Sequence, residues 1–157
     1  MPLEVSVEVF GQTQVKRTIM RPSEHAKDAR PAFRAVLELF RDIERRRFRA
    51  QGPGWTPLKP ETLRRKAARG ERLQILMATG DLFDSLTSPT SGEGISDIDR
   101  HSMRYGTRRP WAESHQFGAP DANIPQRKII DFSEADKRAT VKILQRFILT
   151  GEVDEIG

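Results

Sequence analysis

The chain contains no cysteine, and this absence excludes disulfide bonds and thiolate metal sites. Its three histidines, at positions 25, 101 and 115, are too scattered to supply the three or four ligands of a zinc site. No run approaches the roughly 18 apolar residues of a membrane span, and the first residues do not form a basic stretch followed by an apolar one. We therefore expect no cofactor, no metal, no membrane contact and no signal peptide in a protein made in a cytoplasm.

Recognisable catalytic arrangements are also missing. There is no Gly-x-Ser-x-Gly turn and no glycine-rich phosphate loop followed by a lysine. His115, with Glu113 and His101, invites an acid–base interpretation, but no third group is available to orient such a base. We predict that His115 packs or forms a hydrogen bond, and that the protein is not an enzyme.

The composition indicates one domain with a modest core. The 157 residues suit a single domain, 1–157, but only 36% of them are hydrophobic while 31% are charged. We expect neighbouring subunits to complete part of the apolar surface. The net charge of +5 comes from 27 basic and 22 acidic residues, a mixture that is typical of a solvated surface as well as of a nucleic-acid partner.

Hydrophobic periodicity predicts a strand, a long helix and a polar contact in the first third of the chain. Apolar and polar residues alternate over 3–9, as in a half-buried strand, and residues 15–20 could pair with it. Helical spacing marks residues 31–49 as an amphipathic helix, with these apolar positions: Phe33, Val36, Leu37, Phe40, Ile43 and Phe48. Glu44 and Arg47 fall on the same face, so they must pair with each other or meet a polar partner.

The middle of the chain is predicted to form loops and short helices. Glycine and proline predict a mobile loop over 51–60, which positions Trp55 and Leu58, and a mobile hairpin tip over 88–94. Between them we expect a short helix over 61–68 that stops at Gly70. A second short helix over 80–85 would have Thr79 as its N-cap.

In the last third of the chain we expect strands over 95–98 and 102–106. Residues 106–118 are then expected to form the end of a strand, a turn and a short helix that ends at Gly118. Within that helix Trp111, His115 and Phe117 would gather on about two turns, ended by Gly118. An apolar strand follows over 128–132. Ser133 and Asp136 form a capping-box-like start to a closing helix that ends at 150–151. The fold class is α+β: a small, mainly antiparallel sheet packed against the long helix, with short inserted helices and a C-terminal helix.

Three segments carry recognisable motifs: residues 75–86, with Thr-Gly and a following leucine; residues 106–118; and residues 124–127, Ile-Pro-Gln-Arg. Together they resemble the phage virion morphogenesis (tail completion) family of Mu-like phages. The positions that carry the resemblance, interpreted as structural motif residues, are Thr79, Gly80, Leu82, Gly106, Thr107, Trp111, His115, Gln116, Phe117, Gly118 and Pro125.

The resemblance implies a structural protein of a tailed phage or prophage that acts in tail completion or head–tail joining. It would form a homo-oligomeric ring, a hexamer or a dodecamer, at the neck or tail end. Its partners would be other neck, connector or tail proteins, and it would be found in the virion, at the head–tail junction or on the tail.

Candidate contact residues leave alternatives open. Trp55, Pro57 and Leu58 either fold back on their own core or anchor a neighbouring subunit. Arg127 either binds a partner carboxylate through its planar guanidinium or simply faces solvent.

Arginines on the helices allow a rival function. Arg45, Arg46 and Arg49, with Arg41, are placed on the polar side of the long helix, and Arg64 and Arg65 on the next helix. They form either an ordinary solvated face or a basic surface near DNA or an acidic subunit. The alternative function is therefore a DNA-associated basic protein that lines or contacts the DNA channel.

Overall fold

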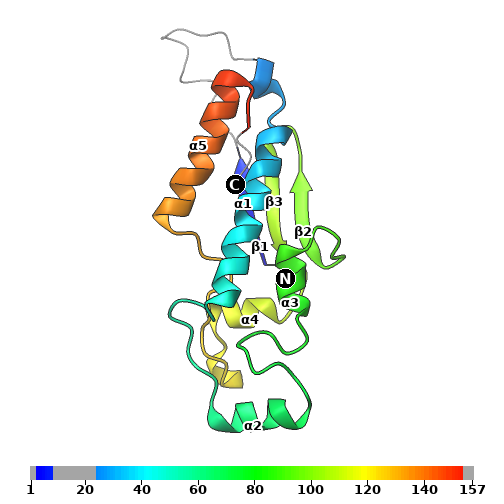
Figure 1. Cartoon of the computed structure of the whole chain (residues 1–157), viewed down its shortest axis with the longest axis vertical. Coiled ribbons are helices and arrows are strands. Elements are labelled where there is room, and N and C mark those ends of the chain that lie inside the picture. The colour runs from blue at the N-terminus through cyan, green and yellow to red at the C-terminus, as the bar shows by residue number, and fades with distance from the viewer. Residues whose placement is uncertain (1–2, 9–23, 154–157) are drawn as a thin grey trace. The chain divides into compact units, whose positions relative to one another are not determined.

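The computed structural model describes residues 3–8 and 24–153, and within them the chain is α+β as predicted. Three antiparallel strands, β1 (Leu3–Glu8), β2 (Gly94–Ile98) and β3 (Ser102–Thr107), form one sheet in the order β1-β3-β2. The predicted strand over 15–20 lies outside the described residues. Figure 1 labels the elements along the chain.

The chain divides into two compact units, and α1 and all three strands contribute residues to both. Unit 1 contains residues 1–4, 41–95 and 106–131, with α2 (Pro60–Ala68), α3 (Asp81–Thr87), α4 (Ala112–Phe117) and the 3-10 turn η2 (Pro120–Ala122). Unit 2 contains residues 5–40, 96–105 and 132–157, with the 3-10 turn η1 (Glu24–Lys27) and α5 (Glu134–Thr150).

The long helix α1 (Arg30–Arg49) confirms the predicted amphipathic helix, because every apolar position listed for it is buried. Phe40 stacks on Phe132, with ring centroids 4.1 Å apart, and packs against Tyr105 of β3 at 5.5 Å. One expectation is wrong: the Arg41 side chain is buried rather than solvated. A single helix carries residues of both units, and its first half packs into the core of unit 2.

Glu44 and Arg47 pair as the sequence suggested, with 3.9 Å between the guanidinium and the carboxylate and both side chains almost fully buried. Arg47 also donates to the carbonyl oxygens of Ile129, at 2.6 Å, and Asp131. The charged face of the helix therefore meets backbone carbonyls of a later segment in unit 1.

The sheet explains Gly106. A Cβ atom at this position would lie 1.9 Å from the carbonyl oxygen of Leu3, so β1 can approach β3 only because residue 106 has no side chain. The β2–β3 hairpin turns at 99–101, where the Asp99 amide donates to Ser102 O at 2.8 Å. The predicted hairpin tip over 88–94 is wrong, because that segment connects helix α3 to strand β2 and does not connect two strands.

The short helices follow the sequence with one shift. α2 matches the predicted helix, and Gly70 adopts φ +67° just beyond it. α3 begins one residue later than expected, because Gly80 at φ +94° is its N-cap. Thr79 instead accepts from the Asp81 amide through its hydroxyl, with 3.4 Å between the atoms.

The predicted strand over 128–132 is wrong. Side chains, not a neighbouring strand, take up its backbone groups: Gln116 Oε1 accepts from the Ile129 and Ile130 amides at 2.7 and 3.0 Å. Gln116 Nε2 donates to Ile130 O at 2.8 Å, and Trp55 Nε1 donates to Lys128 O at 2.9 Å. The apolar residues are buried as predicted, but the segment needs no sheet to satisfy its polar groups.

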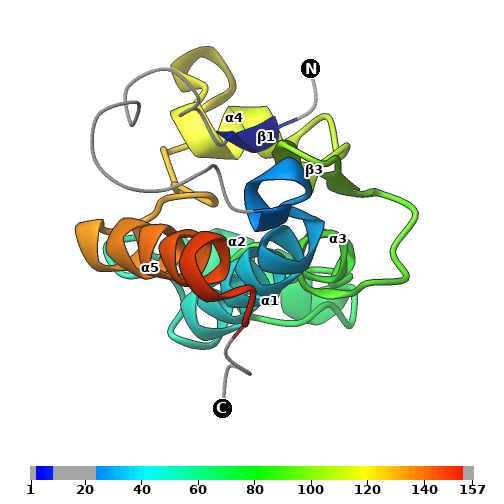
Figure 2. The ribbon, with the colours of Figure 1, turned by 90° about the horizontal axis from the view of Figure 1, so that it is seen from above.

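The closing helix is confirmed at both ends. Ser133 and Asp136 form the capping box that starts α5, and Gly151 ends the helix in the left-handed conformation at φ +76°. Phe147 is buried against His25 of η1, with ring centroids 5.7 Å apart. Figures 1 and 2 both show α5 alongside the first half of α1 within unit 2.

Candidate partner-binding groove

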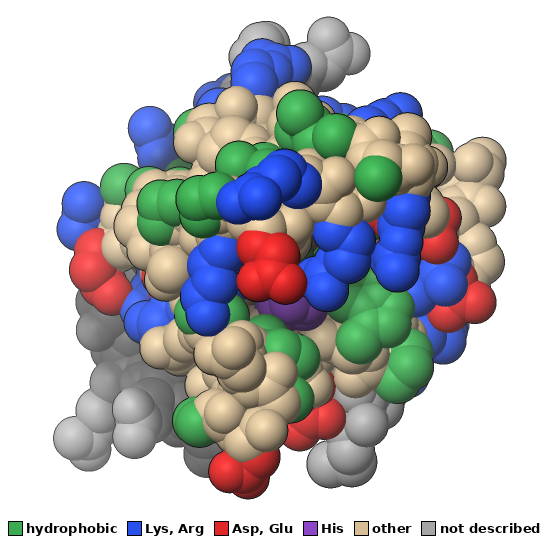
Figure 3. Space-filling model, turned by 90° about the horizontal axis from the view of Figure 1, so that it is seen from below, with side chains coloured by type: hydrophobic (Ala, Val, Ile, Leu, Met, Phe, Trp, Pro, Cys, Tyr) green, Lys and Arg blue, Asp and Glu red, His purple; other side chains and the backbone are tan. Residues whose placement is uncertain are grey.

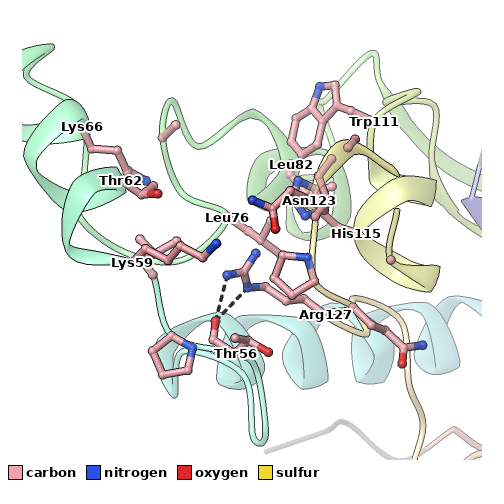
Figure 4. A pocket seen from close by; sticks show the side chains of 18 of the residues that line it. Thr56, Lys59, Thr62, Lys66, Leu76, Leu82, Trp111, His115, Asn123 and Arg127 are labelled. Atoms are coloured by element: carbon pink, nitrogen blue, oxygen red, sulfur yellow. Dashed lines mark hydrogen bonds between the residues drawn. The ribbon is translucent and has the colours of Figure 1, made fainter. Parts of the chain in front are cut away.

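Unit 1 contains an open groove of about 1140 Å³. Its walls come from α2 with the preceding residues 56–59, from segment 76–82, and from α4 with segment 117–127. Figure 4 shows Lys59, Thr62 and Lys66 on one side and Trp111 and His115 on the other. The volume exceeds the roughly 300–1,000 Å³ of most small-molecule sites, which favours a larger occupant.

Arg127 lies between the walls and is only 6% exposed. Its Nε and Nη2 donate to the carbonyl oxygen of Thr56 at 3.0 and 2.9 Å, as the dashed lines in Figure 4 show. Its backbone amide donates to His115 O at 2.7 Å. Arg127 is thus neither the solvent-facing residue nor the exposed anchor that the sequence allowed, because its guanidinium ties the 56–59 loop to segment 124–127.

His115 is a packing residue of the α4 wall. Its ring meets Trp111 edge-on, with centroids 5.9 Å apart. Burial, and secondly the charge of Arg127, lower the pKa of His115 below its ordinary value of 6.5. The imidazole is therefore neutral at pH 7, and no hydrogen-bond partner of its buried Nδ1 lies among the described residues.

Trp111 and Phe117, interpreted from the sequence as structural motif residues, are not part of the core. Trp111 is 40% exposed and Phe117 is 66% exposed, and both line the groove. α4 has only six residues, and the one residue that it buries fully is Ala112. The helix is thus too short to cover its own aromatic side chains.

The loop before α2 separates a core residue from two groove residues. Trp55 is 7% exposed, meets Phe48 edge-on at 5.4 Å and donates its indole N–H to Lys128 O, so it folds back on its own core. It is therefore not available as a neighbour's anchor. Pro57 is exposed and Leu58 is half-buried, and both line the groove.

A strained segment faces α2. Leu76 adopts φ +57°, a conformation that costs a branched residue about 1–2 kcal/mol, and it lines the groove half-buried. The Ile75 amide donates to Gln51 Oε1 at 2.7 Å, and Lys66 Nζ donates to Gln74 O at 2.9 Å. Burial lowers the pKa of Lys66. The sequence gives no sign of this segment, because no glycine or asparagine marks its left-handed residue.

The motif segments meet in unit 1. Thr107 Oγ1 lies 2.8 Å from Ser85 Oγ, which joins the end of β3 to α3. A Cβ at Gly118 would lie 3.2 Å from Gln126 N, so the third segment runs close beneath the end of α4. Leu82 is fully buried and Gly80 is buried, while Thr79 is exposed and Pro125 half-buried.

The candidate DNA-facing arginines lie mostly at the surface. Arg46, Arg49, Arg64 and Arg65 are exposed, and Arg65 also lines the groove. Arg45 is half-buried, pairs with Asp42 and donates to Thr87 O at 2.9 Å. Figure 3 shows Lys and Arg side chains spread over the face seen from below, among hydrophobic and acidic side chains.

Neither a metal-binding cluster nor a membrane-spanning helix occurs within residues 3–8 and 24–153. No three histidine, aspartate or glutamate residues there are grouped so as to hold a metal ion. No helix in the same ranges is long and apolar enough to cross a membrane.

The described residues form a small α+β fold with an open groove that is lined in part by the exposed aromatic side chains of Trp111 and Phe117. The model of the phage virion morphogenesis family matches residues 11–148, and the chain belongs to that family. The family gives it a structural role in phage virion assembly. Comparison with curated proteins and with solved structures finds no match.

Proposed function

We propose that the protein acts in tail completion or head–tail joining, as repeated copies that form a ring at the neck or tail end of the virion. Family membership supports an assembly role, and the groove supplies a contact surface of matching kind. The finer assignment rests on one observation in particular. Trp111 and Phe117 leave large aromatic surface exposed beside a groove, and tryptophan is enriched at the centres of protein interfaces.

The proposed contacts differ from those expected from sequence. Trp55 is buried in the core and Arg127 ties the groove walls together, so the surface offered to a neighbour consists of Trp111, Phe117, Pro57 and Leu58. Other neck, connector or tail proteins would meet the ring on its remaining faces. Assembly would take place in the bacterial host cytoplasm, and the product would stay in the virion.

A stop codon placed early in the gene of the phage or prophage that carries it tests this function. Electron microscopy of the lysate should show filled heads and tails that remain separate, or tails whose ends are incomplete. Supply of the wild-type gene from a plasmid is the control and should restore joined particles. Normal numbers of infectious, joined virions without the protein would contradict the proposed function.

The second candidate is contact with DNA, favoured by the exposed Arg46, Arg49 and Arg64. Binding that neutralises phosphates falls steeply with salt, with a slope of about −0.9 per phosphate on a log–log plot, whereas apolar association does not. Fluorescence anisotropy of a labelled duplex between about 50 and 200 mM salt measures this slope. Arg46→Glu/Arg49→Glu should weaken DNA binding, and equal binding by this variant and the wild type would remove the candidate.

A further inference from the structure

Unpaired positive charge in the groove indicates an acidic occupant. Lys59 and Arg65 form no ion pair with any described residue, and Lys66 and Arg127 are hydrogen-bonded there only to carbonyl oxygens. The lining carboxylates are mostly engaged. Glu71 pairs with Arg69 at 3.7 Å and Asp81 with Arg109 at 3.6 Å, which leaves Glu61 as the lining carboxylate with no ion pair in the described part of the chain.

Apolar surface lies next to these cations. Trp111, Phe117 and Leu76 line the same groove as Lys59 and Arg65. Trp111 and Phe117 are exposed, and Leu76 is half-buried in a left-handed conformation. Strain of this kind gathers at ligand clamps and binding loops. The groove therefore suits a short segment that alternates carboxylates with apolar side chains.

The chain itself contains such a segment. Residues 152–156 read Glu-Val-Asp-Glu-Ile, and no basic residue interrupts them. The Glu152 carboxylate pairs with Arg146 at 3.5 Å, so the acidic residues considered for the groove are Asp154 and Glu155. Other acidic stretches are committed to the fold: Asp81 and Asp84 belong to α3, whose Leu82 is core, and Asp97 belongs to β2. Segment 152–156 follows the left-handed end of α5 at Gly151.

We propose that the groove of one copy binds segment 152–156 of a neighbouring copy, with the carboxylates of Asp154 and Glu155 on Lys59 and Arg65 and with Val153 and Ile156 against the aromatic wall. This inference rests on the proposed function and names the contact that would build the ring. Groove and segment are different surfaces of the chain, so each copy can receive one neighbour and be received by another. Such a head-to-tail contact generates closed rings when its rotation closes, rather than two-fold dimers.

A charge exchange between two full-length variants tests the contact. In one variant the groove is reversed, Lys59→Glu/Arg65→Glu, and in the other the segment is reversed, Asp154→Lys/Glu155→Lys. All four residues are outside the described core: Lys59 and Arg65 are exposed, and the other two lie beyond the described residues. Arg34→Glu/Arg138→Glu is the matched control, because it reverses two exposed arginines that neither line the groove nor belong to the candidate DNA-binding surface.

Sedimentation velocity over a concentration series gives the outcome. The wild type and the control should associate. Each charge-reversed variant alone should associate at least about 10-fold more weakly, and an equimolar mixture of the two charge-reversed variants should associate again. Only contact between copies predicts recovery on mixing. Fluorescence adds an independent readout, since Trp111 should shift to shorter wavelength as the groove fills.

Three results would overturn the proposal: unchanged association of either charge-reversed variant, no recovery in the mixture, or a wild type that stays monomeric throughout. A monomeric wild type would mean that the groove binds an acidic segment of its own chain or of another virion protein, and not a second copy. The gene-disruption experiment above is independent of all three. If disruption of the gene gave separate heads and tails while the charge-reversed variants associated like the wild type, the proposed assembly function would stand and the proposed contact would be wrong.

Discussion

Gln116 offers a direct test of how segment 128–131 is held. Its side-chain amide accepts from two buried backbone amides, those of Ile129 and Ile130, and donates to Ile130 O. Gln116→Ala removes all three hydrogen bonds at once. An orphaned buried donor costs about 1–3 kcal/mol, so two of them give a range of roughly 2–6 kcal/mol.

The lower half of that range is expected, because Gln116 is half-buried and water can reach part of the vacated space. A loss of about 2–3 kcal/mol is large against the roughly 5–15 kcal/mol that stabilise a domain. With a slope of about 2 kcal/mol/M in urea, the midpoint should fall by about 1–1.5 M. Tryptophan fluorescence is a suitable signal, since Trp55 donates to Lys128 O next to the affected residues.

Gln126→Ala is the control for this experiment. Gln126 is exposed and its amide donates only to Gln116 O at 3.1 Å, so the free energy of unfolding should change by no more than about 0.5 kcal/mol. If Gln116→Ala were as mild as this control, the segment would not depend on side-chain hydrogen bonds, and the explanation for the missing strand would be wrong.

Three other predictions concern substitutions at Gly106, His115 and Trp111. Gly106→Ala should unfold the protein or prevent soluble expression, because its Cβ would lie 1.9 Å from Leu3 O, while Gly92→Ala meets open space and should leave the melting temperature unchanged. The pKa of His115 is lowered in the folded state, so the unfolded chain binds more protons and the free energy of unfolding falls as the pH drops below about 6.5. The loss of stability between pH 7.5 and pH 5.5, measured by urea unfolding, should therefore be smaller for His115→Gln than for the wild type. An equal loss in both proteins would show that another group causes the pH dependence. Trp111→Ala should stay folded, with association reduced at least about 10-fold in sedimentation, and unfolding of the variant would return Trp111 to the core.

Much of the fold follows from local sequence signals. Period and capping are local properties, and they located α1, the β2–β3 hairpin and α5 with its Ser133 cap close to their observed bounds. The strand expected over 128–132 failed for a physical reason. Burial of apolar residues is visible in the sequence, but a sequence does not show that Gln116, Trp55 and Arg47 take the place of a neighbouring strand.

The groove was less accessible to sequence reasoning. The sequence marks Arg127 and Trp55 as candidate partner contacts, yet both are buried and bond to residues about 70 positions away, Thr56 and Lys128 respectively. Exposure of Trp111 follows from the shortness of α4, which the sequence did show, although aromatic residues are ordinarily assigned to a core. The left-handed Leu76 carried no signal, because a leucine rarely adopts positive φ.

Gold-labelled antibody against the protein, applied to purified virions and viewed by electron microscopy, tests the central claim most directly. A protein of the neck or tail end should be labelled at one position per particle, at the head–tail junction or at the end of the tail. Particles from a phage whose gene is disrupted are the negative control. Virions that carry no label above that control, although the antibody detects the protein in the lysate, would contradict a structural place in the virion.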